Sequence, residues 1–283
     1  QVEFNTDNQY LLAIDCCHAG ILFKIDLETL QAQRLINSEG FTVSPAQNKI
    51  VSFTHGWAIL DDLENQQEPY VRSSQESRYA RAISPIGKDG LFSGVLENGD
   101  YGRWDSDSLK PIISGSLDFQ PRIAAVSPDG RWLTAVDRDG LIVSLNIETQ
   151  DRTVKTYLYA KSDTLAVVGD RVFFVTNRGQ LAWWNIWTGE YGIYANHQSN
   201  IDLLMASPDA WLYVVSDSRI IQRVSPFNQT GSTTLFEQPN TRIISMTVQN
   251  EGDLFVVVCE QGDGKLLRLD STTGESLGFY PDY

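Results

Sequence analysis

Charged and aromatic residues recur along the chain about every forty residues, each a few positions before a repeated turn sequence. Arginine and tyrosine are favoured anchors in protein interfaces, and charge of both signs suits a peptide-binding rim. The alternative is that these positions are polar only because they face water. The expected partner-binding set is Glu39, Arg78, Tyr79, Arg122, Asp163, Asp202 and Arg242, with Tyr79, Arg122, Asp163 and Asp202 as the leading contacts.

The elements that must position these residues follow from a repeat with two markers. The first marker is the serine of Val126-Ser127-Pro128-Asp129-Gly130, and its equivalents are Thr6, Ser44, Ser84, Val168, Ser207 and Gln249. The second marker closes a later apolar run, at Asp26, Asp61, Asp105, Asn146, Asn185, Ser225 and Asp270. Two markers in step indicate seven copies of one unit, at about 1–35, 36–74, 75–116, 117–159, 160–198, 199–240 and 241–283.

One unit predicts a four-stranded antiparallel meander. In the fourth unit, apolar runs at 123–126, 132–136, 141–145 and 154–158 are separated by turn sequences such as Ser127-Pro128-Asp129-Gly130. Short strands at this period are typical of β-propeller blades. The expected fold is therefore an all-β, seven-bladed β-propeller in a single domain. The chain begins within a strand pattern, so we expect the domain to be part of a longer protein.

The repeat resembles the WD-repeat and YVTN-type propellers. The resemblance rests on 126–133, on 207–215 and on Gly102-Arg103-Trp104-Asp105, which keeps the Trp-Asp pair. No unit keeps the family's Gly-His pair, so its buried Asp–His–Ser–Trp network is not expected. Trp187-Thr188-Gly189-Glu190 also resembles a turn of quinoprotein dehydrogenase blades, but those enzymes usually have eight blades. The resemblance implies a domain that binds proteins.

The residues that could support catalysis or metal binding are few and scattered. The three histidines, His18, His55 and His197, have no clustered ligands beside them. Asp137-Arg138-Asp139-Gly140 and Glu97-Asn98-Gly99-Asp100 lack the spaced carboxylates of a calcium loop, so we expect hairpin turns there. No nucleophile elbow or phosphate-binding glycine loop is present. We expect no catalytic residues, no bound metal and no cofactor.

Charge and cysteine content limit the partners and the compartment. The net charge of −14 disfavours nucleic acid and anionic membranes. Cys16 and Cys259 occupy equivalent positions in the first and last units, but the spacing of packed sheets allows a disulfide only with distortion. We expect three buried thiols, a reducing compartment and a cytoplasmic location. Most of the tryptophans are expected in the core, with Trp187, beside a turn, exposed.

These observations favour a non-catalytic protein-interaction or ligand-sensing domain. Its partner would be a protein, a peptide or another domain of the same chain, in a larger and bacterial protein. The alternative is a propeller enzyme with a site in the central channel, such as a lactonase-like hydrolase, because sequence spacing cannot show which side chains meet at a channel.

Overall fold

In a computed structural model, the described residues of the protein form strands and the turns between them. The structure describes residues 2–4, 10–15, 21–26, 32–37, 40–44, 49–53, 57–61, 70–73, 80–84, 86–87, 89–155, 160–194, 200–207, 209–228, 231–248, 252–260 and 263–280. They contain no α-helix, and so no helix that could cross a membrane. The chain forms two compact units, unit 1 (Gln1–Leu133 and Leu145–Asp151) and unit 2 (Thr134–Ser144 and Arg152–Tyr283).

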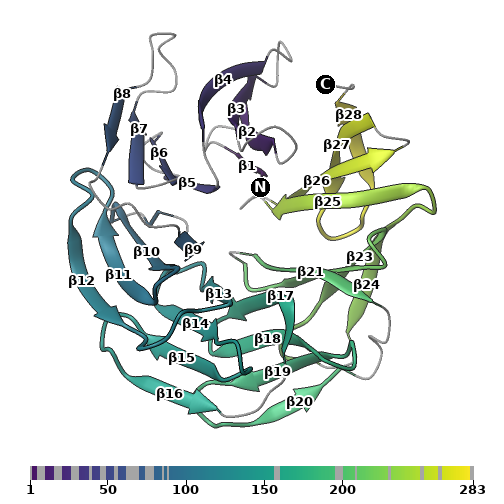
Figure 1. Ribbon diagram of the computed structural model, residues 1–283. Helices are drawn as coiled ribbons and strands as arrows, with labels where there is room; N and C mark the ends of the chain where they lie inside the picture. Colours follow the sequence, from purple (N-terminus) through teal and green to yellow (C-terminus); the bar gives the residue numbers. More distant parts are fainter. Residues whose placement is uncertain are drawn as a thin grey trace. The chain divides into compact units, whose positions relative to one another are not determined.

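Unit 1 contains three complete four-stranded sheets, each built from consecutive strands (Figure 1). The first comprises β1 (Val2–Phe4), β2 (Tyr10–Asp15), β3 (Ile21–Asp26) and β4 (Ala32–Asn37). The second comprises β5 (Gly40–Ser44), β6 (Lys49–Phe53), β7 (Trp57–Asp61) and β8 (Tyr70–Ser73). The third comprises β9 (Ala80–Ile83), β10 (Leu91–Leu96), β11 (Asp100–Asp105) and β12 (Pro111–Ser116).

Unit 2 contains three further sheets of the same kind, and a fourth sheet contributes residues to both units. The shared sheet comprises β13 (Ile123–Val126), β14 (Trp132–Val136), β15 (Ile142–Asn146) and β16 (Arg152–Lys155). The next two comprise β17 (Ala160–Val168), β18 (Arg171–Thr176), β19 (Leu181–Asn185) and β20 (Tyr191–Ile193), then β21 (Ile201–Ala206), β22 (Leu212–Ser216), β23 (Ile220–Val224) and β24 (Ser232–Glu237). The last comprises β25 (Thr241–Val248), β26 (Asp253–Glu260), β27 (Asp263–Asp270) and β28 (Ser276–Tyr280).

Every sheet is an antiparallel meander in chain order, which confirms the four-stranded repeat. β1 pairs with β2 in its own sheet, with Val2 opposite Ala13. Within unit 1 the first strands β1, β5, β9 and β13 contact one another in series, and within unit 2 so do β17, β21 and β25. Consecutive sheets thus meet through their first strands, as propeller blades do.

Several second and third strands are buried on both faces. All five residues of β14, β19 and β22 are buried, whereas the fourth strands β12 and β20 are largely exposed. This explains the near-continuous apolar runs, because a strand covered on both faces has no polar alternation. The adjacent Trp183 and Trp184 are 6% and 0% exposed, whereas Trp187 is 62% exposed, as predicted.

The first sequence marker is a buried serine that closes the turn between the first two strands. Ser84, Ser127 and Ser207 accept a hydrogen bond at Oγ from the backbone N–H of Ser93, Trp132 and Trp211, at 2.9, 2.9 and 3.0 Å. A short hydroxyl side chain can replace a backbone acceptor in this way. The serine therefore recurs at these positions because its hydroxyl supplies an acceptor to the hairpin.

The second marker caps the turn between the third and fourth strands. Asn146 and Asn185 accept, at Oδ1, the N–H groups of the residues two and three positions later, at 2.9 to 3.1 Å. Asp270 accepts those of Thr272 and Thr273 in the same way, at 2.8 and 2.6 Å. Asp, Asn and Ser are interchangeable here because each offers an oxygen at the right reach.

The Asp270 cap makes stability depend on pH. Hydrogen bonds from the N–H groups of Thr273 and Thr272 hold the pKa of Asp270 below its usual value. The stabilisation is complete above the unfolded pKa of about 3.9 and is lost as pH falls through the lower folded pKa. An asparagine side chain offers the same acceptor oxygen, as it does at Asn146 and Asn185, but it carries no titratable proton. We expect the free energy of unfolding to fall by less in Asp270→Asn than in the wild type as the pH is lowered from about 5 to about 2.

Urea denaturation across this range would measure the difference. Asp139→Asn, in the exposed turn after β14, removes one negative charge without removing a cap and serves as the control. Equal acid sensitivity of the wild type and Asp270→Asn would contradict the cap.

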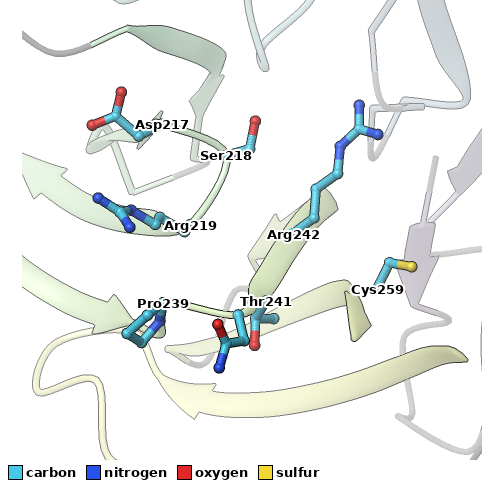
Figure 2. Close-up of a pocket in the computed structure, with 8 residues that line it drawn as sticks. Asp217, Ser218, Arg219, Pro239, Thr241, Arg242 and Cys259 are labelled. Carbon is cyan, nitrogen blue, oxygen red and sulfur yellow. The ribbon is translucent and has the colours of Figure 1, made fainter. Parts of the chain in front are cut away.

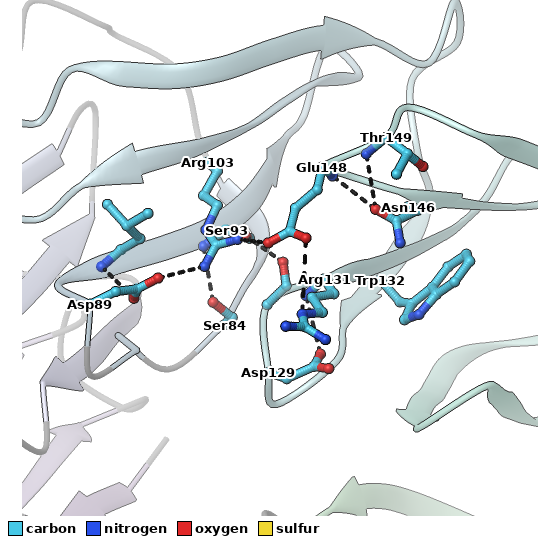
Figure 3. Close-up of polar contacts among 12 residues, drawn as sticks. Ser84, Asp89, Ser93, Arg103, Asp129, Arg131, Trp132, Asn146, Glu148 and Thr149 are labelled. Carbon is cyan, nitrogen blue, oxygen red and sulfur yellow. Dashed lines mark hydrogen bonds and ion pairs between the residues drawn. The ribbon is translucent and has the colours of Figure 1, made fainter.

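Polar side chains join the third and fourth sheets within unit 1 (Figure 3). The Arg103 side chain on β11 is 13% exposed and forms ion pairs with Asp89, at 2.8 Å, and with Glu148. Glu148 lies in the turn capped by Asn146, so the cap also positions this carboxylate. Ser93 Oγ donates a 2.6 Å hydrogen bond to the carbonyl oxygen of Gly130, which adds a second link between the sheets.

Candidate functional site

A shallow polar depression, which we call the groove, lies in unit 2 between the β22–β23 turn and the start of β25 (Figure 2). Its volume is about 680 Å³, and it is broad and open to solvent. Asp217, Ser218 and Arg219 from the turn form one side; the other side comprises Pro239, Asn240, Thr241, Arg242 and Cys259. A concave surface of this size with polar walls suits a segment of another chain better than an enclosed small molecule.

The β22–β23 turn has an unusual backbone. Asp217 and Ser218 have φ angles of 51° and 55°, in the left-handed region that favours glycine, although neither residue is glycine. Such conformations cost about 1–3 kcal/mol each and persist only when the surroundings hold them. Hairpin turns commonly have positive φ at two successive positions, and contacts from outside the hairpin add to the support of this turn.

Asp202 supplies one of these contacts. Its Oδ2 accepts hydrogen bonds from the backbone N–H of Ser218, at 2.6 Å, and from the Ser218 hydroxyl, at 3.0 Å. Its Oδ1 accepts from Asn200 Nδ2 at 2.9 Å. Asn200 also receives the N–H of Asp217 at its carbonyl oxygen, at 2.7 Å. The Asp202 carboxylate thus holds the turn that lines the groove, through the backbone and the side chain of Ser218.

The second wall is tied to the first. The N–H of Ile243 donates to the carbonyl oxygen of Ser218 at 2.6 Å, which links the start of β25 to the β22–β23 turn. Thr241 Oγ1 donates to Gln238 Oε1 at 3.0 Å and closes the turn before β25. The groove is therefore formed before any partner arrives, which lowers the entropy cost of binding.

Cys259 lies opposite Arg242 in the register of β25 and β26 and is a free thiol. It is half-buried, so the expectation that it would be fully buried is wrong. The cause is its place near the end of β26, where the sheet opens into the groove. Cys16 and Cys17 lie outside the described residues.

The groove carries two exposed arginines, Arg219 and Arg242. Within the described residues, neither guanidinium group has a hydrogen bond or an ion pair. In Figure 2 the two side chains leave the backbone in different directions. The groove thus offers charged donors at separate points along its length.

The predicted site residues fall into three groups. Asp202 and Arg242 belong to the groove region, and Arg122 lies half-buried before β13 in unit 1. Asp163 lies on β17, but its side chain is outside the described residues. Glu39, Arg78 and Tyr79, with the three histidines, also lie outside them.

Sequence reasoning missed the β22–β23 turn. A signal was available, because strands alternate in direction within a meander. The turn between the second and third strands must therefore lie at the end where the first strand starts. The Asp217–Arg219 turn and Asp202 meet for that reason.

The titratable residues form no metal centre in the described part of the chain. No group of three or more His, Cys, Asp or Glu side chains gathers there. The turn that begins at Asp137 is a hairpin turn, as predicted. Asp137 Oδ1 accepts the N–H groups of Asp139 and Leu141 at 2.9 and 2.7 Å.

Solved structures similar to this chain are β-propellers, whereas no family model and no curated protein matches its sequence. Dihydro-heme d1 dehydrogenase NirN, in complex with DHE, is 13% identical with a TM-score of 0.65, over 100% of this chain and 66% of that one. The Pan2 WD40 domain of Neurospora crassa is 11% identical with a TM-score of 0.69, over 94% and 87%. The Cps50 (Swd1) β-propeller domain of Myceliophteria thermophila is 13% identical with a TM-score of 0.58, over 99% and 84%.

Identities this low establish the fold alone. The neighbours include WD40 domains and a dehydrogenase, so the fold does not choose between binding and catalysis. The antiparallel four-stranded sheets and these likenesses together show that the chain has a β-propeller fold.

Proposed function

We propose that this chain is a protein-interaction domain that binds a peptide segment of its partner in the groove of unit 2. The observation that carries the proposal is the groove itself. Its two walls are held by Asp202 and by the Ile243–Ser218 hydrogen bond, and its arginines are free to contact a ligand. Loops on a rigid scaffold are where binding residues concentrate.

The wider proposal keeps the loops that lead into the first strands as the binding face. Arg122 would extend this face in unit 1, together with Glu39, Arg78, Tyr79 and Asp163. The partner would be a protein or another domain of the same chain, and the seven sheets would belong to one propeller domain of a larger cytoplasmic protein. The free thiol of Cys259 is compatible with a reducing compartment.

Selection of peptides from a random displayed library on the purified protein would test the proposal. We expect enriched peptides to bind the wild type and to bind Asn240→Trp about tenfold more weakly, because the indole would fill the groove that Asn240 lines. Fluorescence anisotropy with labelled peptides measures the affinities.

Thr272→Trp is the matched control, since Thr272 is also exposed but lies in the β27–β28 turn and does not line the groove. Affinity should be unchanged in this variant. Failure to enrich any peptide, or equal binding by Asn240→Trp and the wild type, would mean that the groove is not a peptide site.

A further inference from the structure

Four exposed arginines occupy one set of loops in unit 2. Arg138, Arg178 and Arg219 lie in the turns between the second and third strands of three successive sheets, and Arg242 lies at the start of β25. Strand alternation places these turns at the ends of the sheets where the first strands start. We call these four residues the arginine arc.

The guanidinium groups of the arc are available to a ligand. None of its four side chains has an ion pair or a hydrogen bond within the described residues. Two basic side chains of the last sheet are paired instead: Arg268 with Asp253, at 2.5 Å, and Lys265 with Glu260, at 2.9 Å. In a protein of net charge −14, these four exposed guanidinium groups concentrate positive charge on one loop set, where they alternate with the carboxylates of Asp137, Asp139 and Asp217.

We propose that the arginine arc binds an acidic segment of the partner in an extended conformation. This inference rests on the proposed function and adds the chemistry of the ligand. A guanidinium group matches a carboxylate with two parallel hydrogen bonds. The arginines come from separate turns, and Arg219 and Arg242 point in different directions (Figure 2), so one small anion cannot contact them all. An extended peptide, at about 3.3 Å per residue, can present several carboxylates along such a surface.

The same loops disfavour nucleic acid. Asp137, Asp139 and Asp217 lie beside the arc arginines in these turns and would repel a continuous phosphate backbone. The carboxylates of the exposed Asp139 and Asp217 can instead accept hydrogen bonds from the N–H groups of a peptide.

Fluorescence anisotropy with defined probes on the whole chain tests this inference. The probes are a labelled peptide of alternating Glu and Ser, the same peptide with Gln in place of Glu, a phosphoserine version, and a single-stranded oligonucleotide. We expect the Glu peptide to bind about tenfold more tightly than the Gln peptide, and to weaken severalfold between about 50 and 200 mM NaCl.

Substitution of the arc gives the decisive comparison. Arg219→Gln and Arg242→Gln should each weaken the Glu peptide about threefold, and together about tenfold. Arg131→Gln is the control, because Arg131 is 61% exposed, lies in the β13–β14 turn outside the arc, and loses the same charge. It should leave affinity unchanged.

The outcomes separate the ligand chemistry from the proposed function. No binding of the Glu peptide, equal binding of the Gln peptide, or equal losses in Arg131→Gln and the arc variants would overturn the acidic-segment inference. The proposed function would survive if neutral peptides selected from the library still lost affinity in Asn240→Trp. Tighter binding of the oligonucleotide than of the Glu peptide would also overturn the inference, as would binding of the phosphoserine peptide alone.

Discussion

Trp184→Ala is expected to lower the free energy of unfolding by about 3–5 kcal/mol, the range found when a large buried aromatic side chain is removed. Trp184 lies on β19 and is 0% exposed. Its Cα partners are Val172 on β18 and Tyr191 on β20, so its indole lies in the middle of the sheet. Alanine would leave a cavity there that close-packed strands cannot collapse to fill.

Two further variants test the cause of this loss, which circular dichroism during urea denaturation would measure. Trp187→Ala removes the same side chain from an exposed turn, where it is 62% exposed, and should change stability by less than about 0.5 kcal/mol. Trp184→Phe should lose clearly less than Trp184→Ala, because Trp184 Nε1 is buried without a hydrogen-bond partner and phenylalanine removes that donor. Similar losses for Trp184→Ala and Trp187→Ala would contradict the buried position.

Gly274→Ala is expected to destabilise the protein by about 3–4 kcal/mol. Gly274 ends the turn capped by Asp270 and has a φ of 76°, which costs about 1–2 kcal/mol for a residue with a Cβ atom. A Cβ atom would also lie 2.0 Å from the carbonyl oxygen of Leu235 on β24. Relieving that overlap requires a backbone shift, which adds about 1–3 kcal/mol.

Gly189 allows the cost of a positive φ to be measured apart from the cost of the overlap with Leu235. It occupies the equivalent place in the turn capped by Asn185, with a φ of 71°, but a Cβ atom there would meet nothing within 4 Å. Gly189→Ala should therefore cost only the backbone term of about 1–2 kcal/mol. Calorimetry or urea denaturation of both variants provides the comparison. If Gly189→Ala destabilised as strongly as Gly274→Ala, the close approach to Leu235 would not be the cause.

The chain's β-propeller fold could be predicted from its sequence because the signals are local. Most of these markers satisfy backbone groups close to them in the sequence, as Ser127 does for Trp132 and Asn185 for Thr188. Turns of this kind require the same few residue types, so these types recur from one repeat to the next. The strands between the markers are apolar because both of their faces are covered. Tryptophan exposure followed from the same pattern, since Trp187 stands at a turn.

The groove and the polar contacts between the third and fourth sheets could be seen only in the tertiary structure. Ser218 and Ile243 are joined by a hydrogen bond across two sheets, and Arg103 reaches Glu148 from a different sheet. No periodic pattern records such contacts, because they join residues far apart in the sequence whose meeting depends on how neighbouring sheets pack. For the same reason the sequence identified Asp202 as a charged position near the first strand, whereas its hydrogen bonds to Ser218 show that it also holds the turn beside the groove.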